Sequence, residues 1–279
     1  MKEEVVKVYW QPGCSSCLKT KEFLMDNGVP FKSVNVLEDK TGFKDLERFG
    51  VKMVPIVAKG DAWANGAVFR DVAKVAGFDY KAHKMLEPKI MVDKIIKINE
   101  AAFRYLEQIP SEKLDTLLPG RPRSYRQLVY HIFNIQDVFL RRVEDNAPYT
   151  YESLLSILPK EMKTKKDLAD YGNKVRKNFL EWWHRDGVTT DFKQPGKVYY
   201  GEVILHEVLE RTAWHSGQHT RQVLLMLKEK LNLVPNEPIE DEVFQGLPMP
   251  KNIWDNERSF SEGSYSGQAL SSVEDFKNL

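Results

Sequence analysis

Short apolar runs alternate with amphipathic segments over roughly the first eighty residues of the chain. An apolar, β-branched run such as residues 5–9 is typical of a buried strand, and spacings of three and four indicate helices. Asn27-Gly28 ends one such helix, because glycine tolerates the left-handed conformation of a helix cap. The order β-α-β-α-β-β-α predicts a small mixed sheet covered by helices. We expect strands at 5–9, 31–36, 53–58 and 62–63, and helices at 17–27, 43–49 and 69–76.

From residue 88 onward the pattern changes to long helices. Pro88 suits a first helical position, and Ser124 with Gln127 forms a capping-box pattern that opens a later helix. The first of these helices carries an apolar stripe at spacings of three and four, and such a stripe must be buried against a partner. The stripe consists of Met91, Ile95, Ile98, Ala102, Tyr105 and Ile109. Four helices, at about 88–109, 124–144, 165–185 and 202–231, predict a bundle with at least one long connection.

The chain therefore divides into an α/β domain, residues 1–83, and an all-α four-helix bundle, residues 88–235. Residues 236–279 read as a Pro-rich extension whose Gly246–Pro250 stretch and Trp254 pack against the bundle as extended chain. A flexible tail rich in Ser, Gly and charge follows from residue 259.

Composition and charge limit the cellular compartments and the classes of binding partner that we expect for this protein. The 41 basic and 40 acidic residues leave no basic excess for nucleic acid. No apolar run is long enough to span a membrane, and the apolar stretch near the N-terminus is too short for a signal peptide. We therefore expect a cytoplasmic protein that binds neither nucleic acid nor membrane. In that compartment a lone pair of cysteines is a poor structural staple, which favours a redox role.

The two cysteines, Cys14 and Cys17, lie between a predicted strand and a predicted helix. Free backbone N–H groups and the positive end of the dipole at a helix start favour thiolate over thiol, which makes Cys14 the nucleophile. Cys17 lies one turn further on and can resolve a mixed disulfide. Half of a zinc site is the alternative, but zinc would need two more ligands nearby and the nearest histidine is His83.

A proline near the third predicted strand supports the redox interpretation. We expect Pro55 to be a cis-proline that faces the cysteines and leaves the backbone of Val54 free to pair with an extended thiol substrate. An ordinary turn proline is the alternative.

Residues 8–17, Val-Tyr-Trp-Gln-Pro-Gly-Cys-Ser-Ser-Cys, and residues 51–57 resemble the glutaredoxins. The resemblance covers about residues 1–80 and implies a thioredoxin-like fold and thiol–disulfide exchange with glutathione, another low-molecular-weight thiol or a protein disulfide. Glutaredoxins usually carry two glycines where this chain has only Gly66. They also usually carry a basic residue near the position that Gln11 occupies here. The substrate-binding residues that the resemblance implies are Trp10, Gln11, Val54, Pro55 and Gly66.

Three of the six histidines lie on stripes that face the bundle interior. His215 and His219 are four residues apart on one helix, and His131 lies on the inward face of another. Three converging imidazoles can bind one divalent metal such as zinc, nickel or iron, and core histidines satisfied by hydrogen bonds are the alternative. His83, His184 and His206 lack such a context. For Glu207, Glu210 and Arg211, a solvated helix face is favoured over a role in orienting the imidazoles.

The segments Leu-Val-Tyr-His-Ile at 128–132 and Trp-His-Ser-Gly-Gln-His-Thr-Arg-Gln at 214–222 resemble the DinB/YfiT-like family. The resemblance covers about residues 88–235. It implies a four-helix bundle, often dimeric, with a divalent metal on His131, His215 and His219. Some members of this family are transferases or isomerases that use low-molecular-weight thiols.

Together these features predict a thiol–disulfide oxidoreductase fused to a metal-binding bundle, acting in one reaction as a thiol-dependent transferase or a reductive detoxification enzyme. Two alternatives remain open. The bundle is a non-catalytic dimerisation or metal-sensing module that targets a plain disulfide reductase to a partner. In the second alternative, the first domain is an electron donor to a reductase, and the bundle is its docking surface.

Overall fold

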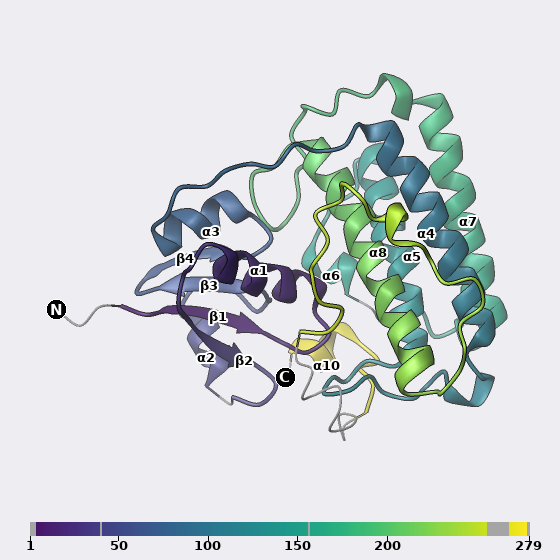
Figure 1. Ribbon diagram of the computed structural model, residues 1–279, viewed down its shortest axis with the longest axis horizontal. Helices are drawn as coiled ribbons and strands as arrows, with labels where there is room; N and C mark the ends of the chain where they lie inside the picture. Colours follow the sequence, from purple (N-terminus) through teal and green to yellow (C-terminus); the bar gives the residue numbers. More distant parts are fainter. Residues whose placement is uncertain (1–3, 40, 156, 256–267, 278–279) are drawn as a thin grey trace.

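The computed structural model describes residues 4–39, 41–155, 157–255 and 268–277, which form an α/β domain beside a helical bundle (Figure 1). The α/β domain has a four-stranded sheet in the order β2-β1-β3-β4. Strand β1 runs parallel to β2 and antiparallel to β3, and β4 is antiparallel to β3. The strands are β1 (Val6–Trp10), β2 (Phe31–Asn35), β3 (Ile56–Lys59) and β4 (Ala62–Asn65).

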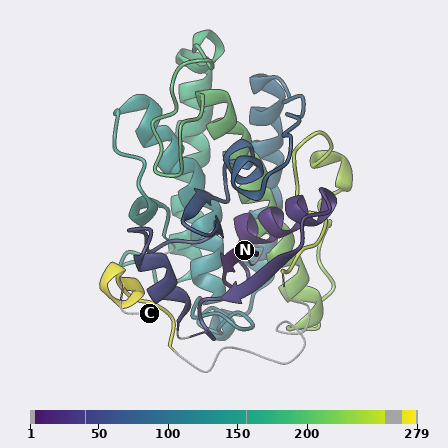
Figure 2. The ribbon, with the colours of Figure 1, turned by 90° about the vertical axis from the view of Figure 1, so that its left-hand side faces the viewer.

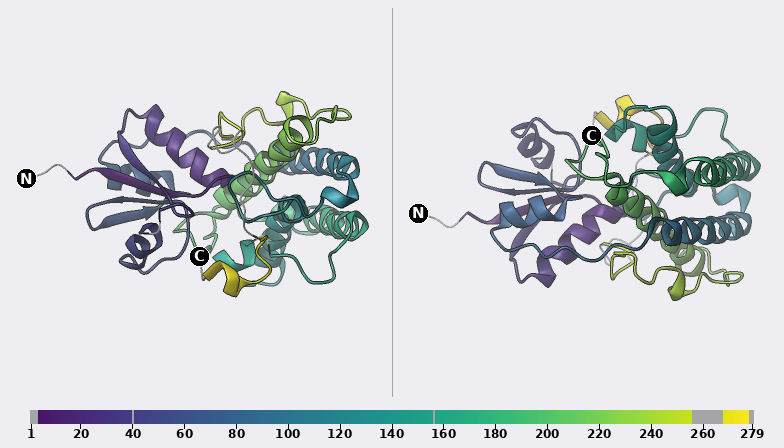
Figure 3. Two further views of the ribbon diagram at one scale, coloured as in Figure 1. Left: turned by 90° about the horizontal axis from the view of Figure 1, so that it is seen from below. Right: turned by 90° about the horizontal axis from the view of Figure 1, so that it is seen from above.

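Helices cover both faces of this sheet, as the near-continuous apolar run in β1 requires. Val8 packs with Leu24 and Val72 on one face, whereas Tyr9 packs with Leu46 on the other. Figure 3 shows the first and second helices of the domain on opposite sides of the sheet. The arrangement is the thioredoxin-like fold that was expected. The helices in question are α1 (Ser15–Asp26) and α3 (Phe69–Ala76) on one face and α2 (Gly42–Glu47) on the other.

Four long helices form the bundle. The capping box of Ser124 and Gln127 is confirmed, and the predicted stripe on the first long helix is buried. The last long helix begins at Leu205, later than expected, because Ile204 is extended and its N–H donates to the Glu207 carboxylate at 2.9 Å. The long connection between the second and third long helices contains α6 (Tyr151–Leu154). The long helices are α4 (Pro88–Gln108), α5 (Tyr125–Glu144), α7 (Lys165–Arg185) and α8 (Leu205–Glu229).

The two domains meet where α1 packs against α8 (Figure 1). Arg211 on α8 donates to Ser16 Oγ at 3.0 Å, and Ser15 Oγ lies 3.4 Å from both ring nitrogens of His219. Figure 2, viewed from the side of the α/β domain, shows that domain in front of the bundle helices. The first turn of α1, which carries the cysteines, therefore faces the bundle rather than open solvent.

The Pro-rich extension contacts both domains, and not the bundle alone as predicted. Glu22 of α1 accepts hydrogen bonds from the backbone N–H groups of Lys251 and Asn252 at 2.7 and 2.9 Å. Trp254 is buried in the bundle core and also lies against Gly13, while the Asp255 carboxylate accepts from Gly13 N–H at 2.8 Å. Residues 251–255 thus tie the cysteine loop to the bundle.

The predicted flexible tail lies partly outside the described residues, since 259–267 and 278–279 are not among them. Between these segments the chain forms α10 (Val273–Lys277), a short helix where a flexible tail was expected. Leu270 N–H donates to Pro122 O at 3.1 Å. No helix in the described part of the chain is long and apolar enough to cross a membrane.

Candidate active site between the two domains

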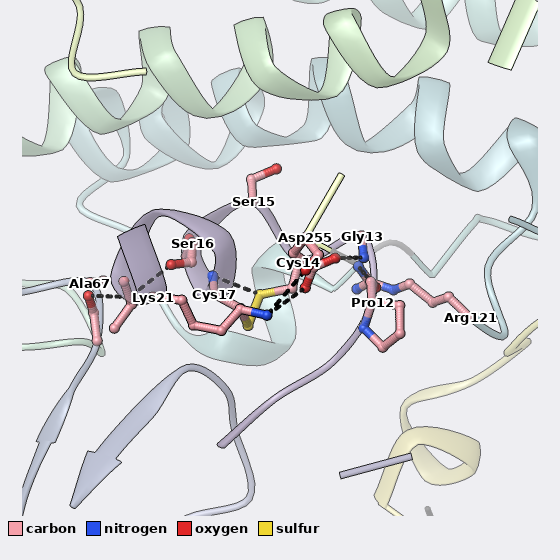
Figure 4. The surroundings of a disulfide bond; sticks show 12 residues. Pro12, Gly13, Cys14, Ser15, Ser16, Cys17, Lys21, Ala67, Arg121 and Asp255 are labelled. Carbon is pink, nitrogen blue, oxygen red and sulfur yellow. Dashed lines mark hydrogen bonds and ion pairs between the residues drawn. A yellow bond between two sulfur atoms is a disulfide. The ribbon is translucent and has the colours of Figure 1, made fainter. Parts of the chain in front are cut away.

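Cys14 is the N-cap residue of α1, in the position that the helix-start argument requires. Its Sγ accepts the backbone N–H of Cys17 at 3.2 Å, and the two cysteines form a disulfide with a Cα–Cα distance of 5.2 Å (Figure 4). Cys17 is fully buried, whereas Cys14 is partly exposed. In the reduced protein, Cys14 is therefore the thiol that a substrate can reach, and Cys17 is placed to resolve a mixed disulfide.

The Val54–Pro55 peptide bond is cis, as predicted. Val54 borders the same cavity as Cys14. However, the backbone of Val54 hydrogen-bonds the side chain of Tyr151, which comes from α6 of the bundle domain. The backbone position that the sequence analysis assigned to an extended thiol substrate is thus taken by a residue of the same chain.

The five predicted substrate-binding residues do not all gather at the cysteines. Gln11 and Val54 line the cavity beside Cys14. Trp10 instead lies in the core, with Lys21 Nζ 3.4 Å from the centre of its ring. Gly66 lies behind Pro55, to whose carbonyl its N–H donates at 2.9 Å, and it borders a separate cavity of about 120 Å³.

The three predicted histidines converge inside the bundle. His131, His215 and His219 are buried, and each offers a ligand atom within 4.8 Å of those of the other two. Burial lowers the pKa of all three imidazoles well below the usual value, and nearby arginines lower it further. The rings are therefore neutral at physiological pH and keep a lone pair for a ligand.

The chemistry of this cluster fits a divalent metal ion. Gln222 Oε1 lies 2.7 Å from His219 Nδ1, which fixes the ring and leaves Nε2 for coordination. The Nε2 atoms of His215 and His219 are 3.2 Å apart. Nδ1 of His131 and Nδ1 of His215 are buried and have no hydrogen-bond partner among the residues that the structure describes. Core histidines with a purely structural role would have their nitrogens satisfied, so the orphaned atoms favour a ligand role.

Cys14 and the histidines border one and the same cavity. It has a volume of about 50 Å³ and is lined from the α/β domain by Gln11, Cys14 and Val54, and from the bundle by the three histidines. The first turn of α1 places Ser15 against His219. The cysteine pair of one domain and the histidine cluster of the other therefore border a single site.

Three buried arginines also line this cavity, and none of them was predicted from the sequence to do so. Arg121 and Arg123 precede α5, and Arg211 lies on α8. Burial lowers the pKa of Arg121 to about 10 and that of Arg123 well below its usual value, because the charged forms are poorly solvated there. A guanidinium nevertheless keeps its proton at neutral pH. No local signal marks Arg121 and Arg123 as buried, since arginines beside a Pro-Gly turn are ordinarily solvated.

The predicted solvated helix face on α8 is wrong for two residues. Glu210 and Arg211 are only 6% and 7% exposed, because α1 and the connector between the domains cover them. Glu210 pairs with His83 Nε2 at 2.8 Å, so His83 also has a structural partner that its sequence context did not indicate. Glu207 stays partly exposed and pairs with Arg70.

The fold and the cysteine pair define a thiol–disulfide oxidoreductase domain. In comparisons with known proteins, the glutaredoxin family model matches residues 6–63, and the DinB superfamily model matches residues 97–223. The chain thus joins a glutaredoxin domain to a DinB superfamily domain, and both resemblances found in the sequence are confirmed. Searches of the curated proteins and of the solved structures find no match to it.

Proposed function

We propose that the protein is a thiol-dependent enzyme that acts on a small molecule held between its dithiol and a three-histidine metal site. The observation that carries the proposal is the shared cavity, since Cys14, His131, His215 and His219 all border it. If the two domains had separate activities, their reactive groups would not need to border the same cavity.

The dithiol supplies a two-electron reduction. The Cys14 thiolate attacks one sulfur of a substrate disulfide, forms a mixed disulfide and expels the other sulfur as a thiolate. The Cys17 thiolate then attacks Cys14 Sγ, which releases the bound half of the substrate as a second thiolate. The protein is left with the Cys14–Cys17 disulfide, and an external thiol must reduce it before the next turnover.

The histidines would hold a divalent ion through their neutral imidazoles, with Gln222 orienting His219. When bound, such an ion supplies Lewis-acid polarisation or favours the thiolate form of a coordinated sulfur. The buried ring nitrogens and the absence of acidic ligands among the three suit zinc, nickel or iron.

A small molecule is favoured over a protein disulfide as the substrate. The backbone of Val54, with which a peptide substrate would pair, already forms a hydrogen bond with Tyr151. The cavity is small, about 50 Å³, and both domains line it, which suits a compact group better than a peptide segment. This geometry argues against a plain electron donor to a reductase and against a bundle that serves only to target the reductase.

The dithiol is tested with the variant Cys14→Ser and a small disulfide such as 2-hydroxyethyl disulfide. We expect the variant to lose reduction of this substrate. Cys17→Ser is the matched variant, because it keeps the attacking thiol and should still form a mixed disulfide detectable by mass spectrometry. Full reductase activity in Cys14→Ser would contradict the proposal for this domain.

The metal site is tested by metal analysis of protein purified without chelator. We expect one divalent ion per chain in the wild type and its loss in His215→Ala. His184→Ala is the control, because His184 lies exposed on α7, away from the cluster, and should leave the metal content unchanged. Substoichiometric metal that does not respond to His215→Ala would favour the non-catalytic bundle instead.

A further inference from the structure

The arginines that line the cavity form a cluster of buried positive charge, and the Asp255 carboxylate, whose charge acts on Arg121, does not balance all three. Arg121, Arg123 and Arg211 are 8%, 8% and 7% exposed. Among the residues that the structure describes, none of the three forms an ion pair, whereas arginines elsewhere in the chain do. A buried charge is costly unless an opposite charge or strong hydrogen bonds compensate it. Three of them around one cavity therefore indicate that a counter-ion binds there.

Internal hydrogen bonds satisfy these guanidinium groups only in part. Arg121 donates to Pro12 O at 3.3 Å, and Arg211 donates to Ser16 Oγ at 3.0 Å and to the hydroxyl of Tyr199. Nε of Arg211 is buried, and no described residue forms a hydrogen bond with it. For Arg123, no side-chain hydrogen bond is found within the described part of the chain. The cluster thus keeps free donors next to Cys14 and the histidines.

We propose that Arg121, Arg123 and Arg211 bind the anionic group, a carboxylate or an oxyanion, of a small ligand in this cavity. A guanidinium presents donors in a planar fork that matches a carboxylate or phosphate, and such charge-assisted pairs are strong. All three residues belong to the bundle domain, so this anion site is not part of the glutaredoxin framework. For its catalytic consequence the proposal rests on the proposed function: the bound anion would hold the substrate with its sulfur at Cys14.

The thiolate of reduced Cys14 is itself a possible counter-ion, so binding must be measured on the oxidised protein. In that form the Cys14–Cys17 disulfide carries no charge and cannot exchange with a second disulfide without a thiolate. Calorimetric titration of the full, oxidised chain with 3,3′-dithiodipropionate and with inorganic phosphate should show saturable binding of at least one of them. Binding of phosphate alone would identify a free oxyanion as the ligand. Failure of both anions to bind would overturn the proposal.

Turnover is tested with three small disulfides of similar size and different charge. These are the dianion 3,3′-dithiodipropionate, the neutral 2-hydroxyethyl disulfide and the dication cystamine. We expect kcat/KM to be about tenfold to hundredfold higher for the dianion than for the neutral compound, the range of one or two charge-assisted hydrogen bonds, and lowest for cystamine. This comparison needs only the wild-type protein, so it does not depend on whether a variant folds.

The arginine variants assign the preference to the cluster. Arg123→Gln should lower the ratio of kcat/KM for the dianion over the neutral disulfide by about tenfold, while Arg123→Lys, which keeps the charge but loses the fork, should lower it less. Arg141→Gln is the matched control, because Arg141 lies at the surface of α5, where it pairs with Asp137. An unchanged ratio in Arg123→Gln would contradict the assignment.

The two proposals fail in different ways. Equal turnover of all three disulfides would overturn the anion site and leave the oxidoreductase function standing. Absence of turnover for all three, with anion binding to the oxidised chain retained, would overturn the proposed function and leave the anion site standing.

Discussion

Asp255 offers a sharp test of how the C-terminal extension is held on the cysteine loop. Its carboxylate has one oxygen on Gly13 N–H at 2.8 Å and the other 3.9 Å from Lys21 Nζ, and the side chain is 1% exposed (Figure 4). Burial raises the pKa of Asp255 from 3.8 to about 6, although the charge of Lys21 opposes the shift. The folded protein therefore binds this proton more tightly than the unfolded chain does.

The sign of the pH dependence follows from linkage. Between about pH 4 and pH 6 the folded state holds the proton and the unfolded state has lost it, so the free energy of unfolding falls as pH rises through this window. The shift from 3.8 to about 6 corresponds to roughly 3 kcal/mol at about 1.4 kcal/mol per pKa unit. The three buried histidines act in the opposite sense, because their pKa values are lowered.

Comparison with Asp255→Asn isolates this contribution. Urea unfolding of the oxidised protein at several pH values from 4 to 7 gives two curves, and the contribution of the histidines cancels in their difference. We expect the wild type to lose roughly 3 kcal/mol relative to the variant as pH rises across the window. A difference that stays flat or increases with pH would refute the buried, protonated state of Asp255.

Three further substitutions test the same part of the molecule. Gln222→Ala should weaken zinc binding about tenfold to hundredfold in a chelator competition, because His219 loses its orienting partner. Gly13→Ala should destabilise the protein in urea more than Gly28→Ala, since both glycines have a φ of +66° but only at Gly13 would the new Cβ meet Trp254, at 2.7 Å. Trp254→Ala should cost about 3–5 kcal/mol in the same assay, and a loss below 1 kcal/mol would contradict its place in the core.

The features that the sequence alone determined are those with a local physical cause. Placement of Cys14 at a helix start follows from a strand, a short loop and a helix in succession, and the structure makes it the N-cap. Spacing along α8 puts His215 and His219 on one face, because an α-helix repeats every 3.6 residues. The capping box at Ser124 likewise needs only residues within one turn. For such features, neighbours in the sequence suffice.

Only the tertiary structure decided what lies opposite each of these features. The burial of Arg121 beside Pro12 and of Arg211 beside Ser16 depends on a domain that is distant in the sequence, and helical periodicity cannot show which surface another domain will cover. The same holds for the contact of Tyr151 with Val54 and for the hold of residues 251–255 on α1. These contacts join residues about a hundred or more positions apart, so no local pattern in the sequence encodes them. Packing between the domains brought the dithiol, the histidines and the arginines to one cavity.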